Sequence, residues 1–283
     1  MFQKNIKASD PESPQALSAQ ADIHLLYEAA VQDVESEIDF VEQTWSELRH
    51  RPAVFLREDF CGTANTACEW VVRDDEHQAV GVDLDSEVLE WGRQNRLAQL
   101  DGEQQERIEL LNENVLHSRP GPADIILAMN FSYYLFLTRD ALREYFINAL
   151  DGLVSDGIFF LDAYGGYEAP MVLTESRECQ DENDNDFTYI WDQVSFNPID
   201  SCMNCQIHFE FPDGSRLDRA FDYVWRLWTL PEIRELLYEA GFSQVDIYWE
   251  GTDAEKNEGN GIYTPAEIGD ADPGWVCYIV AQV

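Results

Sequence analysis

Hydrophobic residues recur near the start of the chain at steps of four and three positions. They are Tyr27, Val31, Val34, Ile38, Val41, Trp45 and Leu48. On a helix this spacing places them on one stripe, so the pattern predicts a helix within residues 21–50 that lies against a larger body. The preceding residues 1–20 are polar and contain Pro and Ser, which predicts a loose N-terminal arm.

From residue 53 onward, short apolar runs alternate with amphipathic segments. Strands are expected at residues 53–56, 79–82, 108–111, 123–129 and 157–161. Helices are expected at residues 66–72, 87–100 and 140–153. This alternation predicts a doubly wound α/β fold, with a mostly parallel sheet that is covered on both faces.

A segment rich in aromatic residues then interrupts the α/β pattern. After a polar run at 181–186, strands are expected at residues 188–196, 206–211 and 217–228. The dipeptide Asp213-Gly214 predicts a hairpin turn between the second and third of them. We therefore expect an antiparallel β insertion after strand five, over residues 168–228, that forms a lid.

The α/β pattern resumes after the insertion. Residues 229–232 form a capping box with an early proline, and Gly241 is placed to end the helix that follows. Strands at 245–249 and 275–280, separated by a Gly-rich loop, complete an expected sheet of seven strands. The α/β core would thus comprise residues 51–167 and 229–283.

Composition narrows the classes of partner. The chain has 18 basic and 55 acidic residues, a formal net charge of −37, which repels phosphate backbones and argues against nucleic acid binding. Whether this acidity serves solubility or steers a substrate stays open. No signal peptide or apolar run of about 20 residues is evident, so we expect no membrane partner, a cytoplasmic protein and reduced cysteines.

The segment Arg57-Glu-Asp-Phe-Cys-Gly-Thr-Ala64 follows the first expected strand. A turn of small residues lets a ligand approach the backbone, and the next helix offers free N–H groups. Asp83 ends the second expected strand, the position where such folds bind a ribose diol with a carboxylate. These features predict a cofactor that contains adenosine.

Residues 57–64 also help to distinguish between the cofactors that contain adenosine. In the dinucleotide fingerprint G-x-G-x-x-G, Phe60 and Asn65 would stand at the first and last glycine positions. Glu58 and Asp59 would repel a pyrophosphate, whereas a sulfonium and an ammonium group tolerate carboxylates. The chemistry favours S-adenosylmethionine over NAD, and an NAD-dependent oxidoreductase is one alternative.

The segments REDFCGT, GVDLD, NFSY and LDAYGG occur in this order. On them the chain from about Tyr27 onward resembles the class I S-adenosylmethionine-dependent methyltransferases, in particular a bacterial and fungal branch with such segments. The resemblance implies a Rossmann-like fold. Glu58, Cys61, Gly62 and Thr63 match the first motif, in which Phe60 and Ala64 replace two glycines.

The resemblance also implies roles for single residues. Asp83 matches the acid that binds ribose, Asn114 the residue that bonds the adenine amino group, and Val115 a wall of the adenine pocket. Either Glu58 or Asp59 is expected to contact the cofactor. The expected cofactor site comprises Tyr27, Arg57, Glu58, Asp59, Phe60, Cys61, Gly62, Thr63, Asp83, Leu84, Asn114, Val115 and Asn130.

Two residues after the fourth strand are candidate catalytic residues. Asn130-Phe-Ser-Tyr133 is loosely similar to the Asn-Pro-Pro-Tyr motif of amino-group methyltransferases, so Asn130 and Tyr133 are expected to orient the acceptor. The alternative is that these aromatics pack in the core. Aromatic residues in the insertion and the acidic charge favour a small amine as acceptor.

Metal binding is not expected. Cys202, Cys205 and His208 lack the second ligand pair of a structural zinc site, and residues 181–186 lack the glycine and glutamate of an EF-hand loop. A non-catalytic protein that binds S-adenosylmethionine or a nucleotide remains an alternative to the enzyme.

Overall fold

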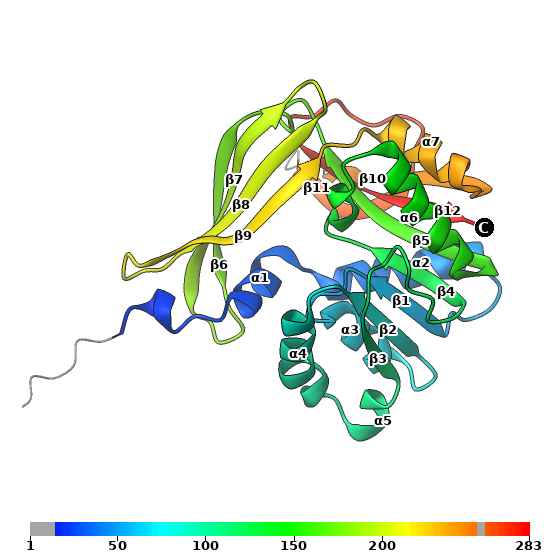
Figure 1. The fold of residues 1–283 in the computed structure, drawn as a ribbon, viewed down its shortest axis with the longest axis horizontal. Helices are drawn as coiled ribbons and strands as arrows, with labels where there is room; N and C mark the ends of the chain where they lie inside the picture. The colour runs from blue at the N-terminus through cyan, green and yellow to red at the C-terminus, as the bar shows by residue number, and fades with distance from the viewer. Residues whose placement is uncertain (1–14, 254–257) are drawn as a thin grey trace, which may run out of the picture.

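The computed structural model describes residues 15–253 and 258–283, which contain two β-sheets (Figure 1). The large sheet has the strand order β11-β10-β12-β5-β4-β1-β2-β3, and the small sheet has the order β6-β7-β8-β9. The strands of the large sheet are β1 (Phe55–Asp59), β2 (Gln78–Asp83), β3 (Ile108–Asn112), β4 (Ala123–Ala128), β5 (Leu153–Gly165), β10 (Gln244–Asp253), β11 (Glu258–Pro265) and β12 (Trp275–Gln282).

The large sheet confirms the predicted α/β architecture and corrects its strand number. Strands β1 to β5 are parallel, whereas β12, β10 and β11 pair antiparallel. The sheet has eight strands instead of seven, because residues 258–265, expected to form a loop, pair with β10 as an edge strand. Gly259 and Gly261 weaken the strand pattern of this segment, and an edge strand needs less of it.

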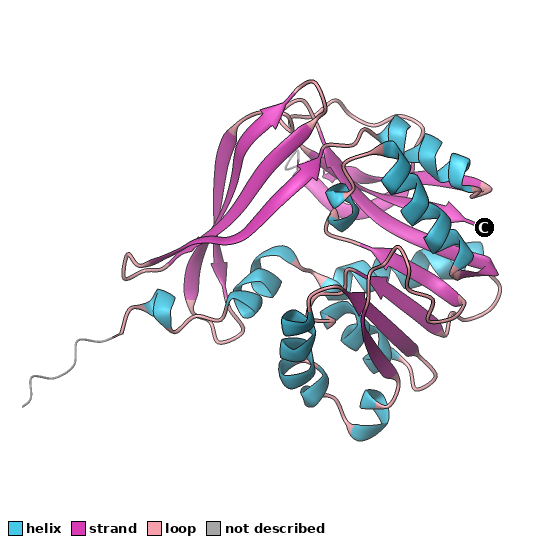
Figure 2. Cartoon of the chain, in the orientation of Figure 1, coloured by secondary structure: helices cyan, strands magenta, loops and turns pink. Residues whose placement is uncertain are grey.

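Helices cover both faces of the large sheet (Figure 2). Apolar side chains of α2, α3 and α4 pack on one face, and those of α6 and α7 pack on the other. Among the helices that the structure describes, none is long and apolar enough to cross a membrane. The helices are α1 (Ile23–Val31), α2 (Val34–Leu48), α3 (Asn65–Arg73), α4 (Ser86–Asn95), α5 (Gly102–Gln105), α6 (Arg139–Asp151) and α7 (Leu230–Ala240), with 3₁₀ turns at Leu17–Ala19, Leu97–Gln99 and Ser132–Leu135.

The single N-terminal helix predicted from the apolar stripe is in fact two helices. Gln32 has an extended backbone, and the Asp33 carboxylate accepts the Ser36 N–H at 3.2 Å, which starts α2 anew. The two halves of the apolar stripe therefore pack against different sheets. Side chains of α2 such as Ile38 enter the core of the large sheet, whereas Leu26 of α1 packs against the small sheet.

The expected loose arm is only partly within the described residues, since residues 1–14 lie outside them. Residues 17–19 form a 3₁₀ turn that is held by the hairpin between β8 and β9. The Leu17 N–H donates to the Asp213 carboxylate at 2.9 Å, and the Ser18 N–H donates to Ser215 Oγ at 3.0 Å. The chain is thus anchored from residue 17 onward.

The antiparallel insertion is present as the small sheet, with one strand that was not predicted. Strand β6 is polar and mostly exposed at the sheet edge, so it carries little hydrophobic signal. The hairpin at Asp213-Gly214 joins β8 to β9, and Gly214 has φ +79° there. The strands are β6 (Leu173–Gln180), β7 (Asp186–Asn197), β8 (Cys202–Glu210) and β9 (Arg216–Arg226).

Candidate functional site

The turn between β1 and α3 keeps a glycine-like backbone without the glycines. Phe60 has φ 58° and Ala64 has φ 60°, a left-handed conformation that non-glycine residues seldom adopt. These are the two positions at which the resembling family has glycine. The Cys61 N–H donates to the Val82 carbonyl at 3.1 Å, which ties the turn to the end of β2.

Asp83 lies at the carboxyl end of β2, beside this turn. Its carboxylate accepts the N–H groups of Gly62 and Asp85, each at 2.9 Å. The helix α4 is capped by Asp85, which accepts the Glu87 and Val88 N–H groups. Asp83 is therefore not the cap of this helix, although it lies only two residues before Asp85.

Three cavities lie at this end of the sheet. The loop cavity, about 350 Å³, is lined by the β1–α3 turn, and the edge cavity, about 430 Å³, by the ends of β2 and β3. The inter-sheet cavity, about 620 Å³, lies between the large and small sheets. Tyr27, Asn130 and Tyr223 line all three, so the cavities meet at these side chains.

The structure brings the predicted cofactor residues together, with one exception. Those that line the loop cavity are Tyr27, Glu58, Asp59, Phe60, Cys61, Gly62, Thr63, Asp83 and Asn130. Those that line the edge cavity include Leu84, Asn114 and Val115. The Asn114 side chain accepts the Leu116 N–H at 2.9 Å, which leaves its amide nitrogen for other partners.

The exception is Arg57, which does not reach a cavity. Its side chain is fully buried on the α6 side of β1, and its Nε lies 2.7 Å from Asp59 Oδ1. The Tyr145 hydroxyl donates to the other oxygen of Asp59 at 2.9 Å. Both Asp59 oxygens therefore have partners, although the residue lines the loop cavity.

Glu58 points to the opposite face of β1 from Arg57 and Asp59, because side chains alternate along a strand. Its Oε2 accepts the Ala67 N–H at 2.9 Å, at the start of α3. Burial raises the pKa of the Glu58 carboxyl to about 8. Of the two acids, Glu58 is the one that is not engaged by a cation.

Tyr133 does not occupy the position that the motif similarity predicted. It lies in the 3₁₀ turn after β4, is fully buried, and donates its hydroxyl to the Asp162 carbonyl at 2.7 Å. The Tyr133 ring instead packs in the core, as the alternative interpretation of this segment expected. Ser132, its neighbour, lines the loop and edge cavities instead.

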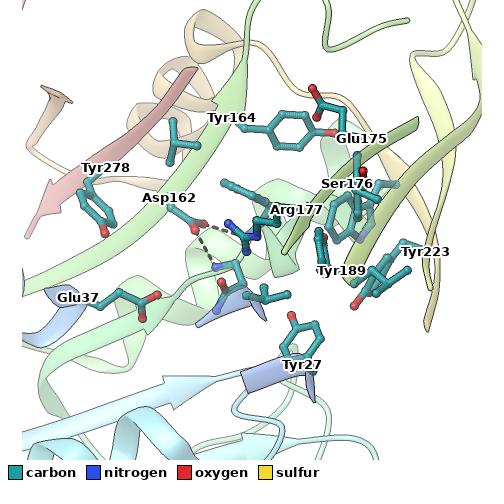
Figure 3. A pocket seen from close by; sticks show the side chains of 17 residues that line it. Tyr27, Glu37, Asp162, Tyr164, Glu175, Ser176, Arg177, Tyr189, Tyr223 and Tyr278 are labelled. Atoms are coloured by element: carbon teal, nitrogen blue, oxygen red, sulfur yellow. Dashed lines mark hydrogen bonds between the residues drawn. The ribbon is translucent and has the colours of Figure 1, made fainter. Parts of the chain in front are cut away.

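Asn130 does lie at the junction of the cavities, in a strained segment. Asn130 and Phe131 have φ 56° and 55°, two consecutive left-handed residues without glycine. The Asp162 carboxylate accepts their N–H groups at 2.7 and 2.8 Å and so holds this backbone in place (Figure 3). Burial raises the pKa of the Asp162 carboxyl to about 7.

The inter-sheet cavity has an acidic core side and an aromatic lid side. Glu37 and Asp162 line it from the core, and Figure 3 shows Arg177, Tyr189 and Tyr223 opposite them. Among the aromatic residues of the insertion, Tyr189, Trp191 and Trp225 line the cavity. Trp228 is buried and donates to the Phe136 carbonyl at 3.2 Å, and Phe196 packs against the core of the large sheet.

Several residues that line this cavity could not be recognised from the sequence. Tyr164 and Asp162 lie in the LDAYGG segment, which was noted without a role. Glu37 lies in the N-terminal helical pattern, where an acid looks like part of a solvated face. No periodicity marks these residues as neighbours, because they meet only through the packing of α2 on β5.

The cysteines and histidine considered for zinc do not converge. Cys205 is buried in the core, whereas His208 Nδ1 accepts the Arg219 N–H at 3.0 Å. Within residues 15–253 and 258–283, no group of three potential ligands is arranged to hold a metal ion. Within the acidic run, residues 181–185 form the turn between β6 and β7, and Asp186 begins β7.

Helix α1 connects the β1–α3 turn, α4 and the small sheet. The Glu28 carboxylate accepts from Thr63 Oγ1 at 2.5 Å and from Arg96 Nε at 2.9 Å. The Trp91 Nε1–H donates to Asp22 at 2.7 Å. Leu26 packs on the other side of α1 against the small sheet, so the helix covers the loop cavity.

We expect Glu28→Gln to loosen this cover. The variant keeps the size of the side chain but removes the charge that the Arg96 guanidinium meets, a loss of about 1–3 kcal/mol of folding free energy. Urea unfolding and hydrogen exchange of residues 22–31 measure the effect. Glu90→Gln on α4, an exposed acid paired with Arg93, is the control and should change stability by less than about 0.5 kcal/mol. Equal effects of the two variants would contradict the role of Glu28.

The sequence matches no family model and no curated protein that we compared with it. The fold, in contrast, is similar to solved structures. An S-adenosylmethionine-dependent methyltransferase from Clostridium acetobutylicum has a TM-score of 0.66 at 18% identity, over 91% of this chain and 96% of that one. An amino pentose methyltransferase from Micromonospora echinaspora, with S-adenosylmethionine bound, has a TM-score of 0.64 at 13% identity, over 96% and 99%.

A third similar structure is a sugar N-methyltransferase from Streptoalloteichus, with a TM-score of 0.63 at 12% identity, over 100% of this chain and 98% of that one. At such identities the likeness concerns the fold, and it extends over nearly the whole of each chain. The lid sheet and the N-terminal helices therefore fall within the matched region. The chain has the Rossmann-like fold of these class I methyltransferases.

Proposed function

We propose that the chain is an S-adenosylmethionine-dependent methyltransferase that acts on a small amine. The observation that carries this is the continuity of the site. The loop and edge cavities, both lined by the strand-end acid Asp83, share the lining residue Asn130 with the inter-sheet cavity, which is lined by acids and aromatics. A cofactor and an acceptor can thus lie on the two sides of one junction.

The residues of the loop and edge cavities are suited to this cofactor. Asp83 would accept from the ribose hydroxyls, and Asn114 with Val115 would hold the adenine. Glu58, which lines the loop cavity, would face the methionine part, whose sulfonium supplies the methyl group. Among the described residues, no Lys or Arg lines either cavity, so a pyrophosphate would find no countercharge.

The acceptor cavity favours a cation. The rings of Trp191 and Trp225 line it, and buried carboxylates line the core side. The ring of Tyr189 already has a cation beside it, because the Arg177 guanidinium carbon lies 5.1 Å from its centroid. Asn130 stands at the junction with a fixed backbone and is the residue that we expect to orient the acceptor nitrogen. Two of the similar structures are described as an amino pentose and a sugar N-methyltransferase, which supports an amine.

Catalysis in such a site depends mainly on alignment. The strained Asn130–Phe131 backbone, the buried Asp162 and the ring of aromatics hold the acceptor in one orientation and exclude water. The lid sheet and α1 both line the cavities, whose volumes are about 350, 430 and 620 Å³, so we expect the acceptor to be a small molecule.

Methylation of an amine by this chain can be observed directly. The full-length protein is incubated with S-adenosylmethionine and separate panels of amines, carboxylic acids, phenols and thiols. We expect S-adenosylhomocysteine to form and a product to gain one methyl group only in the amine panel, as mass spectrometry will show. Methylation of acids or phenols with all amines unchanged would contradict the amine proposal.

A further inference from the structure

Glu37 is a buried acid that lines the inter-sheet cavity. Its side chain comes from the first turn of α2 and is 8% exposed. Among the described residues, no hydrogen-bond donor reaches its Oε2. Figure 3 shows the Glu37 side chain extending from α2 into the cavity, which Asp162 and Tyr27 also line. A buried carboxylate in this condition is costly unless a cation meets it.

The other acid of the cavity differs from Glu37 in its contacts. Both oxygens of Asp162 accept backbone N–H groups of Asn130 and Phe131, so Asp162 serves the backbone. Among the described residues, the Glu37 carboxylate accepts no such backbone N–H group. On the next turn of α2, Phe40 stacks on Tyr278 at 4.2 Å between ring centroids, which fixes the position of the helix beside the cavity.

We propose that the Glu37 carboxylate binds the ammonium group of the acceptor and takes its proton. The inference rests on the proposed function and names a catalytic residue for it. An N–H bond of the ammonium breaks, its electron pair stays on nitrogen, and the proton moves to Glu37. The nitrogen lone pair then forms the new N–C bond while the C–S bond breaks, with its pair left on sulfur.

The surroundings of Glu37 support this role. Burial, followed by the charges of Asp162, Glu58 and Asp33, raises the pKa of the Glu37 carboxyl to about 8. A base with a pKa near neutral pH can both receive a proton and release it again. The titratable groups that act on Glu37 from the core are Asp162 of β5, Glu58 of β1, Asp33 before α2, Tyr27 of α1 and Tyr278 of β12. From the lid, the charged residues Glu175 and Arg177 of β6 line the same cavity.

Binding tests the inference without turnover. Benzylamine and its neutral counterpart benzyl alcohol are titrated into the full-length chain by calorimetry, at a pH just above the pKa of Glu37. We expect Glu37→Gln to weaken benzylamine binding by about 10- to 100-fold, the range of a charged hydrogen bond, and to leave benzyl alcohol within about twofold. The matched control is Glu35→Gln, an exposed acid of the same helix, which should change neither.

The pH dependence of stability provides a second readout. Because the folded-state pKa of Glu37 is raised above that of the unfolded chain, its contribution to stability is present below about pH 4.5 and is lost as pH rises through about 8. Unfolding measured across this window should depend less on pH in Glu37→Gln than in the wild type or Glu35→Gln. Identical dependence in all three proteins would overturn the placement of a titrating carboxyl at Glu37.

Turnover separates this inference from the proposed function. In the wild type, kcat/KM for an amine should rise as pH increases through about 8, and this limb should remain when an amine of different pKa is used. Glu37→Gln should lose the limb. Amine methylation unaffected by Glu37→Gln would overturn the inference alone, whereas a benzylamine preference without any methylation would overturn the proposed function alone. No preference of the wild type for benzylamine would also overturn the inference.

Discussion

Replacing Asp83 is expected to weaken S-adenosylhomocysteine binding more than any other change in the loop and edge cavities. In Asp83→Ala we expect a loss of about 1–3 kcal/mol, or about 5- to 150-fold in Kd, because the ribose hydroxyls lose a charged acceptor. The Gly62 N–H, which donates to this carboxylate at 2.9 Å, also loses its partner, so the β1–α3 turn should loosen. Calorimetry measures the affinity.

A second variant separates the two effects of this change. Asp83→Asn keeps an oxygen for the Gly62 N–H but removes the charge, so its affinity should lie between those of the wild type and Asp83→Ala. The control is Asp75→Asn, an exposed acid before β2, which should leave the affinity unchanged. Wild-type affinity in Asp83→Ala would remove this residue from the site.

Replacing Asp59 is expected to reduce stability more than any other single change considered. The ion pair of Arg57 and Asp59 is fully buried, with 2.7 Å between Nε and Oδ1. Asp59→Asn leaves the guanidinium buried beside a neutral group, at a cost of about 3–5 kcal/mol. Urea unfolding measures the loss, and Asp140→Asn in the exposed pair with Arg143 should cost less than about 0.5 kcal/mol.

A double variant keeps this prediction testable if Asp59→Asn does not fold. Arg57→Met combined with Asp59→Leu removes both charges and should recover most of the stability, because an apolar pair needs no countercharge. A double variant that is less stable than Asp59→Asn would show that the pair is not the reason for the loss.

The strand-end positions of the site could be predicted from the sequence. Asp83 and the β1–α3 turn were found because apolar runs define β1 and β2, and a parallel sheet brings their carboxyl ends together. Asn114 and Val115 follow β3 in the same way. The position of Arg57 could also have been predicted. Side chains alternate along a strand, so Arg57 and Glu58 cannot face the same side of β1, although both were expected in the cofactor site.

Other parts of the site depend on contacts between distant segments. Tyr133 was assigned from a motif, but the 3₁₀ turn at 132–135 directs its ring into the core. The break at Asp33 divides one apolar stripe between two sheets, and the stripe alone contains no sign of it. Glu37 acquires its position from that break, because α2 then packs on the large sheet, where Phe40 contacts Phe160 of β5 and Tyr278 of β12.

The missed strands have a different physical reason. Both β6 and β11 are edge strands, which bury few side chains and so need no alternating apolar pattern. Strand β6 nevertheless contributes Arg177 to the inter-sheet cavity, so an exposed edge forms part of the proposed acceptor site. A polar segment of this insertion can therefore lie at the proposed acceptor site.

Binding of the cofactor to the unmodified chain tests the central claim most directly. S-adenosylhomocysteine and NADH are titrated separately into the full-length protein by calorimetry. The account predicts saturable binding of S-adenosylhomocysteine, and no binding of NADH, whose pyrophosphate would meet Glu58 and Asp83 without a basic partner among the described lining residues. Tight NADH binding with no response to S-adenosylhomocysteine would contradict it.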